Sequence, residues 1–241
     1  DFKYWRPMML VFSQFSKEDD LKLNGELNLV NQLMKRGHGL TLVAGVIEGK
    51  YKDNTEKITE TQAHLDEVLA EKRIDGFGDV VCCSSVMEGY QIMIHSGGIG
   101  PLRFNSVLMS LPDDVRTMGP ERMGDFCELV DDVKLAGKTL FLCKGAIGLP
   151  DLPQTGYMDI WWIFDIFPAN GLTLFFAYLL SKHAVWKKTR IRLFCVIQSI
   201  NADEKQELEK RLQEMCNAGG IQLKVEVLLA SPPDEDAQST A

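Results

Sequence analysis

The sequence has 241 residues, of which 45% are hydrophobic and 25% are charged, which fits one globular α/β domain or two half-sized ones. Its net charge of −8 excludes the basic footprint that a nucleic-acid surface needs, and it disfavours adsorption to anionic lipid. We therefore expect no nucleic-acid partner. The chain begins at Asp1 without a methionine and carries no signal peptide, and we expect a fragment of a larger protein.

The first half alternates expected strands with expected helices. Apolar runs predict strands over residues 8–12, 40–47, 79–83, 105–109 and 138–143. Helical spacing of apolar residues predicts helices over 26–36, 55–72, 86–95 and 120–130. Residues 13–24 are polar and charged, and we interpret them as a loop. The run at 40–47 is apolar throughout, which is typical of a strand buried on both faces.

The most apolar stretch of the chain lies in the second half, at residues 157–181. Four residues interrupt it, so it is too short for a membrane span: Asp159, Asp165, Pro168 and Asn170. We instead predict a strand at 160–164 buried on both faces, a turn, and a helix at 172–181. A strand at 190–196, a helix beginning at Asp203 and an edge strand at 221–229 follow.

This alternation predicts an α/β fold with a mostly parallel, doubly wound sheet and helices on both faces. We expect a first α/β half at residues 1–144 and a linker loop rich in Gly and Pro at 145–156. A second half at 157–230 should pack on the same sheet. The acidic tail at 231–241 should be disordered.

No pattern in the sequence predicts catalysis. It contains no G-x-S-x-G elbow, no P-loop and no G-x-G-x-x-G after a strand. Asp159 and Asp165 would lie roughly 20 Å apart along a strand, too far for an acid–base pair. The histidines have no metal-ligand neighbours, and the cysteines, which form no C-x-x-C pair, suggest buried thiols in a reducing compartment. We expect no enzyme and no metal site.

A nucleotide is the candidate small ligand. Open parallel sheets bind ligands at the carboxyl ends of their strands, and residues 13–24 leave the first strand there. Their lysines, Lys17 and Lys22, can meet a phosphate or simply form a solvated, mixed-charge loop. Gly97-x-x-Gly100, followed after nine residues by Ser110, resembles the phosphate loop of the universal stress proteins, although Ser110-Leu111 stands where Gly and then Ser or Thr are usual. We therefore expect two universal-stress-protein-like halves.

Six motifs in register resemble a known family, the cytosolic C-terminal domain of the cation–chloride cotransporters. They are Trp5-Arg-Pro, Gly39-Leu-Thr-Leu-Val, Glu88-Gly89, Asn105-Ser-Val, Asp159-Ile-Trp-Trp-Ile, and Trp186-Lys-Lys with Ile191-Arg-Leu-Phe. The resemblance runs from Trp5 to about Leu229. Two segments look closer to the potassium–chloride branch than to the sodium-coupled one: Gly37-His-Gly-Leu-Thr and Phe194-Cys-Val-Ile-Gln.

The resemblance implies a regulatory domain on the cytoplasmic side of the plasma membrane. Such a domain would form a homodimer, contact its own transmembrane transport domain, and respond to regulatory kinases and phosphatases. Some members of the family hold a nucleotide beside the first strand with two lysines. The nucleotide-binding candidates here are Ser13 and Lys22, with ATP or ADP as the cofactor, and Gln14 stands at one of the lysine positions.

One segment departs from the family pattern. The family has Asp-Gly-Gly after the tryptophan strand, whereas this chain has the longer turn Ile166 to Asn170 before Gly171. We expect that turn to change a contact with a partner subunit or with the membrane domain. The alternative to a cotransporter domain is a stand-alone nucleotide-binding sensor of the universal-stress type.

Overall fold

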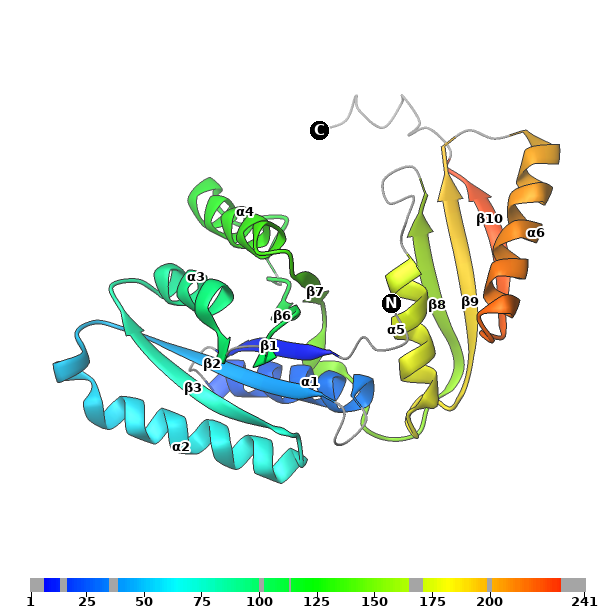
Figure 1. Ribbon diagram of the computed structural model, residues 1–241. Helices are drawn as coiled ribbons and strands as arrows, with labels where there is room; N and C mark the ends of the chain where they lie inside the picture. Colours follow the sequence, from blue (N-terminus) through cyan, green and yellow to red (C-terminus); the bar gives the residue numbers. More distant parts are fainter. Residues whose placement is uncertain are drawn as a thin grey trace. The chain divides into compact units, whose positions relative to one another are not determined.

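The computed structural model describes residues 7–13, 17–34, 39–99, 102–112, 114–164, 171–198 and 201–230 (Figure 1). The chain forms two compact units, residues 1–149 and 150–241, which divide inside the predicted 145–156 loop. The turn Ile166–Asn170 and the tail 231–241 lie outside the described residues. Within the described residues, no helix is long and apolar enough to cross a membrane.

Unit 1 contains a five-stranded parallel sheet in the order β3-β2-β1-β6-β7. Its strands are β1 (Met8–Ser13), β2 (Leu40–Glu48), β3 (Gly76–Cys83), β6 (Ser106–Ser110) and β7 (Thr139–Cys143). Its helices are α1 (Lys17–Leu33), α2 (Thr55–Lys72), α3 (Val86–Ser96) and α4 (Pro120–Leu135). Short elements complete the unit: η2 (Tyr51–Asp53), η3 (Ala146–Gly148), and the antiparallel pair β4 (Gly98–Ile99) and β5 (Leu102–Arg103).

The strand order of unit 1 explains why helices cover both faces of its sheet. The chain steps outward from β1 to β2 to β3, returns past β1 to β6, and then steps the other way to β7. Right-handed crossovers taken in opposite directions place their helices on opposite faces. Accordingly α1 and α2 lie on one face, and α3 and α4 lie on the other (Figure 1). The predicted doubly wound fold is confirmed here.

The centre of the unit 1 sheet is buried on both sides. Leu10 and Val11 point to opposite faces of β1, and both are fully buried. The pattern of β2, buried from Thr41 to Ile47, matches the strand predicted to be covered on both faces. One close approach requires glycine: a Cβ at Gly25 of α1 would lie 1.9 Å from the carbonyl oxygen of Ala146 in η3.

Unit 2 contains a three-stranded parallel sheet in the order β10-β9-β8. Its strands are β8 (Thr155–Ile163), β9 (Lys188–Ile197) and β10 (Leu223–Leu229), and its helices are α5 (Gly171–Lys182) and α6 (Ala202–Ala218). Here the chain always steps in the same direction, so both right-handed crossovers place their helices on one face. That face holds the core, which includes Trp162, Leu193, Leu174 and Leu212.

Four expectations differ from the structure, and the first three concern whole elements. The strands of unit 2 form their own sheet instead of adding to the first one, because β8, β9 and β10 pair in sequence order with one another. The tryptophan strand β8 is an edge strand covered on one face, with Trp162 buried and Trp161 57% exposed. The predicted loop 13–24 is mostly helix, since α1 begins at Lys17, and the buried Leu23 lies one turn before the buried Leu27.

The start of α6 differs by two residues from the prediction. Asn201, not Asp203, is the N-cap, and it forms a capping box with Glu204. The side chain of Asn201 accepts from the Glu204 amide at 2.8 Å, and the carboxylate of Glu204 accepts from the Asn201 amide at 3.3 Å. The edge position predicted for residues 221–229 is confirmed by β10.

Candidate functional site

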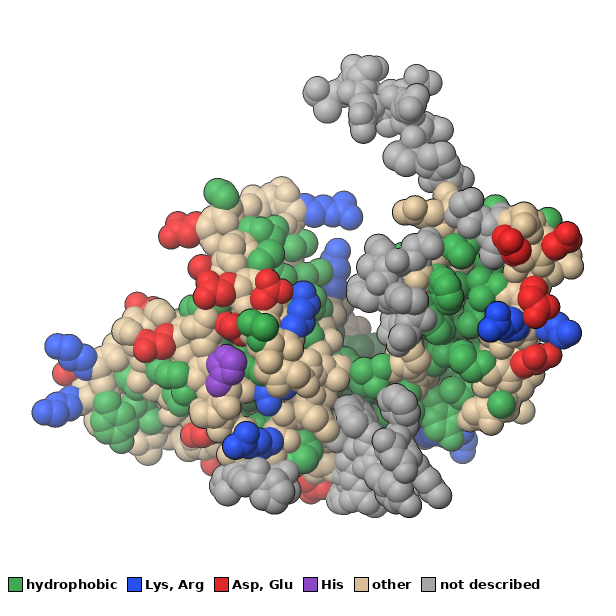
Figure 2. Space-filling view, turned by 45° about the horizontal axis from the view of Figure 1, so that its top comes forward, with side chains coloured by type: hydrophobic (Ala, Val, Ile, Leu, Met, Phe, Trp, Pro, Cys, Tyr) green, Lys and Arg blue, Asp and Glu red, His purple; other side chains and the backbone are tan. Residues whose placement is uncertain are grey.

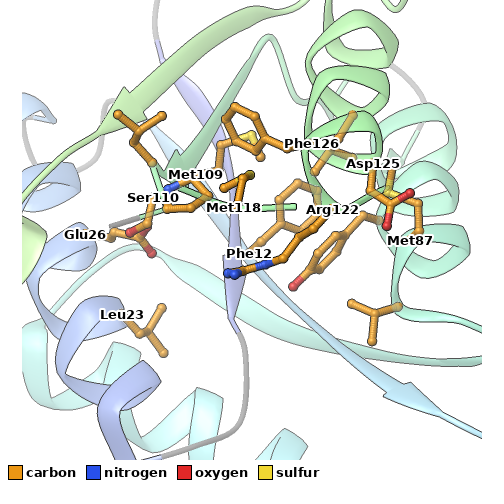
Figure 3. Close-up of a pocket in the computed structure, with 15 residues that line it drawn as sticks. Phe12, Leu23, Glu26, Met87, Met109, Ser110, Met118, Arg122, Asp125 and Phe126 are labelled. Atoms are coloured by element: carbon orange, nitrogen blue, oxygen red, sulfur yellow. The ribbon is translucent and has the colours of Figure 1, made fainter. Parts of the chain in front are cut away.

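A cavity of about 320 Å³ opens in unit 1 at the carboxyl ends of β1 and β6 (Figure 3). These neighbouring strands are the point from which the chain winds in opposite directions, the topological switch point at which open α/β sheets bind ligands. Each surrounding element contributes a wall: Phe12 from β1, Met109 from β6, Met87 from α3, Phe126 from α4 and Leu23 from α1. The fold therefore forms a cavity at the edge of the sheet where we expected a ligand to bind, and ligand binding itself stays a prediction.

Most of the cavity wall is apolar. The rings of Phe12 and Tyr90 are in contact, with centroids 4.3 Å apart and planes tilted by 41°. Thioethers line the wall beside these rings, at Met87, Met109 and Met118. Aromatic rings and thioethers are polarisable and favour flat, unsaturated groups as neighbours.

The polar part of the wall is a carboxylate joined to a hydroxyl. Glu26 of α1 is only 2% exposed, and its Oε1 accepts a 2.6 Å hydrogen bond from the Oγ of Ser110 at the end of β6. The thiol of Cys143, the register partner of Ser110 in β7, has its pKa raised by burial and then by the negative charge of Glu26. A buried carboxyl group, hydrogen-bonded to a hydroxyl, thus lies at this end of the cavity.

The α4 side of the wall carries charges of both signs. Arg122 extends from α4 over the cavity in Figure 3, and its guanidinium forms an ion pair with Asp114. Asp125 lies one helical turn further along α4 and also lines the cavity. The described wall therefore holds two carboxylates, Glu26 and Asp125, and one guanidinium, which already has an anionic partner.

The predicted nucleotide residues are sequence neighbours of two residues that line this cavity. Ser13 is the last residue of β1 and Lys22 lies in α1, next to the wall residues Phe12 and Leu23 respectively. The side chains of Ser13 and Lys22, and Gln14, are outside the described residues. Whether Ser13 and Lys22 bind a nucleotide stays a prediction.

The residue that sequence reasoning missed is Glu26. Ser110 was considered as part of a phosphate loop, but its hydroxyl donates to a carboxylate. The sequence carried a signal for Glu26, since it lies three residues after Leu23 and four before Val30, on the apolar stripe of α1. An acidic residue on a buried stripe is uncommon unless a partner compensates for its burial.

Among the described residues, no group of three or more His, Cys, Asp or Glu side chains could hold a metal ion. The described cysteines are free thiols. On the face drawn in Figure 2, Lys and Arg side chains stand scattered among Asp and Glu and form no broad basic patch. The arrangement around the cavity offers binding groups, with acceptor oxygens at one end and aromatic surface in the middle.

The sequence model of solute carrier family 12 matches residues 26–137 and 151–222, well over half of the chain. The chain belongs to solute carrier family 12. This confirms the resemblance to the cation–chloride cotransporters at the level of the family, and the matched residues include the cavity wall from Glu26 to Leu129.

Two solved structures share the fold of this family 12 chain. The first is described as the cytoplasmic domain of a prokaryotic cation chloride cotransporter, with a TM-score of 0.62 and 16% sequence identity. The match covers 95% of this chain and 80% of that one. The second is a putative universal stress protein from Pseudomonas aeruginosa UCBPP-PA14, with a TM-score of 0.53 and 14% identity, covering 94% of this chain and 76% of the other. The predicted universal-stress-like α/β architecture is confirmed.

Proposed function

We propose that this chain is the cytosolic regulatory domain of an electroneutral potassium–chloride cotransporter. The observation that carries the proposal is the combination of the family 12 match with the fold of a cotransporter's cytoplasmic domain. The potassium–chloride branch is supported by the Gly37-His-Gly-Leu-Thr and Phe194-Cys-Val-Ile-Gln segments. The domain would act through dimerisation and contact with its own transmembrane transport domain, on the cytoplasmic side of the plasma membrane, under the control of kinases and phosphatases.

The direct test is a domain exchange. The chain replaces the cytosolic domain of a potassium–chloride cotransporter, and chloride-dependent rubidium uptake is compared with that of a cotransporter lacking the domain. We expect the chimera to recover uptake, and light scattering of the purified chain to give the mass of a dimer. Uptake no higher than that of the truncated transporter contradicts the regulatory role, and sodium-dependent uptake contradicts the branch.

A matched pair of variants controls for folding in this assay. Gly25→Val places side-chain atoms against the Ala146 carbonyl and should abolish the recovery, because α1 can no longer lie against η3. Gly124→Ala adds a methyl group in α4 where nothing lies within 4 Å, and it should leave uptake unchanged. Equal uptake for the two variants would mean that the signal does not depend on the folded domain.

A second candidate function is small-molecule sensing of the universal-stress type, because a cavity lies at the switch point of the sheet. Its nucleotide version assigns phosphate contacts to Ser13 and Lys22. Calorimetric titration with ATP tests this version: sub-millimolar binding that is lost in Lys22→Ala supports it. Titration with millimolar ATP that releases no heat removes it.

A further inference from the structure

The Gly39-Leu-Thr-Leu-Val motif places a polar side chain in the interior of unit 1. Thr41, near the start of β2, is 0% exposed, and its Oγ1 has no hydrogen-bond partner among the described residues. The Thr41 backbone is paired, since its amide donates to the carbonyl oxygen of Asp75 at 3.0 Å. Burying a hydroxyl without a hydrogen bond destabilises a fold, so most such groups bond to protein or to an ordered water molecule.

A small cavity lies beside this hydroxyl. It shares no lining residue with the cavity at the carboxyl ends of β1 and β6, and it lies near the amino ends of the strands. Besides Thr41, its wall comes from α1 and the residues after it, and from the turn between α2 and β3: Val30, Asn31, Met34, Gly39, Arg73, Ile74 and Asp75.

The size of this cavity limits what it can hold. Its volume is about 20 Å³, whereas one water molecule needs roughly 10–15 Å³ and pockets for organic ligands begin at roughly 300 Å³. The space therefore accepts a single water molecule or a monatomic ion, and no phosphate or organic group.

Close packing around Thr41 keeps the cavity from collapsing onto the hydroxyl. Gly76 is the register partner of Thr41 on β3, and a Cβ there would lie 2.2 Å from the Thr41 carbonyl oxygen. On the other side, a Cβ at Gly39 would lie 2.2 Å from the sulfur of Met34. Because the neighbouring chain is already this near, the wall cannot move further inward to meet the Thr41 side chain.

The wall offers a water molecule the polar partners that it needs, usually two to four. The Thr41 hydroxyl can both donate and accept, and the Asn31 side chain has an amide donor and a carbonyl acceptor. Val30 and Asn31 belong to the last turn of α1, where helix carbonyl groups lack partners within the helix.

The charges around the cavity favour a neutral occupant. The carboxyl end of α1 carries partial negative charge, and Asp75 lines the wall, so a chloride ion is disfavoured although Arg73 also lines it. A calcium or magnesium ion takes six or more oxygen ligands, and among the described residues no group of three acidic or metal-binding side chains forms.

We propose that this cavity binds one water molecule, which hydrogen-bonds to the Thr41 hydroxyl and joins the start of β2 to the last turn of α1 at Asn31. The water completes the hydrogen bonding of the one buried polar side chain in the motif. The proposal concerns the folding of unit 1 and does not depend on the function proposed above.

High-resolution crystallography of the whole chain tests the proposal directly. We expect electron density for one oxygen atom within hydrogen-bond distance of Thr41 Oγ1 and of a second polar atom of the wall. A crystal soaked in bromide should give no anomalous signal at this position, because the site takes no halide.

Three variants test what the water contributes. Thr41→Val keeps the shape and removes the hydroxyl, so the water loses a partner, and urea unfolding should show a folding equilibrium constant lower by about threefold to tenfold. Thr41→Ser keeps the hydroxyl and should keep the density. Thr61→Val is the matched control: it removes a threonine hydroxyl from α2, outside the cavity wall, and should change the constant by less than about twofold.

Three results would each overturn the proposal. The first is a protein atom or an anomalous bromide peak at the position expected for the water, and the second is no density there at all. The third is a Thr41→Val chain that is more stable than the unaltered one, since this is expected of a hydroxyl buried without any partner. If Thr41→Val does not fold, the density in the unaltered chain still decides.

Discussion

The two units of this chain use the same building block, a parallel strand followed by a right-handed helical crossover, and reach different results. In unit 1 the direction of winding reverses at β1 and β6, so helices cover both faces and a cavity opens at the reversal. In unit 2 the direction never reverses, so α5 and α6 lie on one face. A change of direction therefore produces both the second layer of helices and the cavity between the layers.

The face of unit 2 opposite the helices is exposed and aromatic. Trp161 stacks on Phe194 with centroids 4.7 Å apart, and Arg192 lies 4.1 Å from the ring centre of Tyr157. Arg192 also forms two 2.7 Å hydrogen bonds to Asp159 on the neighbouring strand. Side chains on this face of unit 2 contact one another, and no helix among the described residues covers them. In unit 1, helices pack on both faces of the central strands.

The largest expected effects come from the buried centre of each sheet. Leu10→Ala in β1 and Leu193→Ala in β9 each remove a fully buried side chain, and each should cost about 2–5 kcal/mol of unfolding free energy. Urea unfolding followed by hydrogen exchange should assign the loss to unit 1 for Leu10→Ala and to unit 2 for Leu193→Ala. Equal losses in both units for either variant would mean that the units do not unfold separately.

Two glycine substitutions in the α3–α4 layer test how closely it packs on the unit 1 sheet. A Cβ at Gly89 in α3 would lie 2.3 Å from a methyl carbon of Val46 in β2, so Gly89→Ala should cost about 1–3 kcal/mol. Gly124→Ala in α4 meets no neighbour and should stabilise by about 0.5–1 kcal/mol, because alanine favours helix. Thermal unfolding measures both. Two effects of the same sign would contradict the packing described.

A smaller effect is expected on the exposed face of unit 2. Trp161 is 57% exposed and contacts Phe194, so Trp161→Ala should cost about 1 kcal/mol or less. Trp162→Ala, its buried neighbour, should cost about 3–5 kcal/mol in the same unfolding experiment. Similar losses for the two tryptophans would mean that something covers Trp161 in solution.

The smallest effect concerns pH. Hydrogen bonds and the charge of Arg192 hold the pKa of Asp159 below its ordinary value in the folded chain. The folded state therefore binds this proton less readily than the unfolded state, and the contribution is present at neutral pH and fades as pH falls below about 4. Unit 2 in Asp159→Asn should lose less stability between pH 6 and pH 3 than the unaltered chain does. An unchanged pH profile would contradict the role of this pair.

Most of the secondary structure could be predicted from the sequence. The spacing of apolar residues and the residue types at helix ends depend only on neighbouring positions in the chain. The apolar run of β2 predicted a strand buried on both faces, and Pro120 marked the start of α4. The start of α1 was missed because the charged residues 17–20 resemble a loop, although acidic side chains also suit the first turn of a helix. The place of the candidate site followed from the parallel fold.

The contents of the site did not follow from the sequence. Ser110 and Glu26 are 84 residues apart, and the sequence around either residue does not predict that the other is its hydrogen-bond partner. The burial of β8 was also misjudged, since Ile160 to Phe164 is apolar at every position and a strand exposed on one face usually alternates. Only contacts with residues far away in the sequence make Trp162 buried and leave Trp161 exposed.

The sequence alone thus determined the order of strands and helices, the parallel α/β class and the family, because periodicity and motifs act over neighbouring residues. The tertiary structure decided the order of strands in each sheet, which face each helix covers, and which side chains meet at the cavity. These depend on contacts between residues far apart in the chain. The direction of winding is one such long-range property. It reverses in the sheet of unit 1, which is covered on both faces and has a cavity, and it stays the same in the sheet of unit 2, which has an exposed aromatic face.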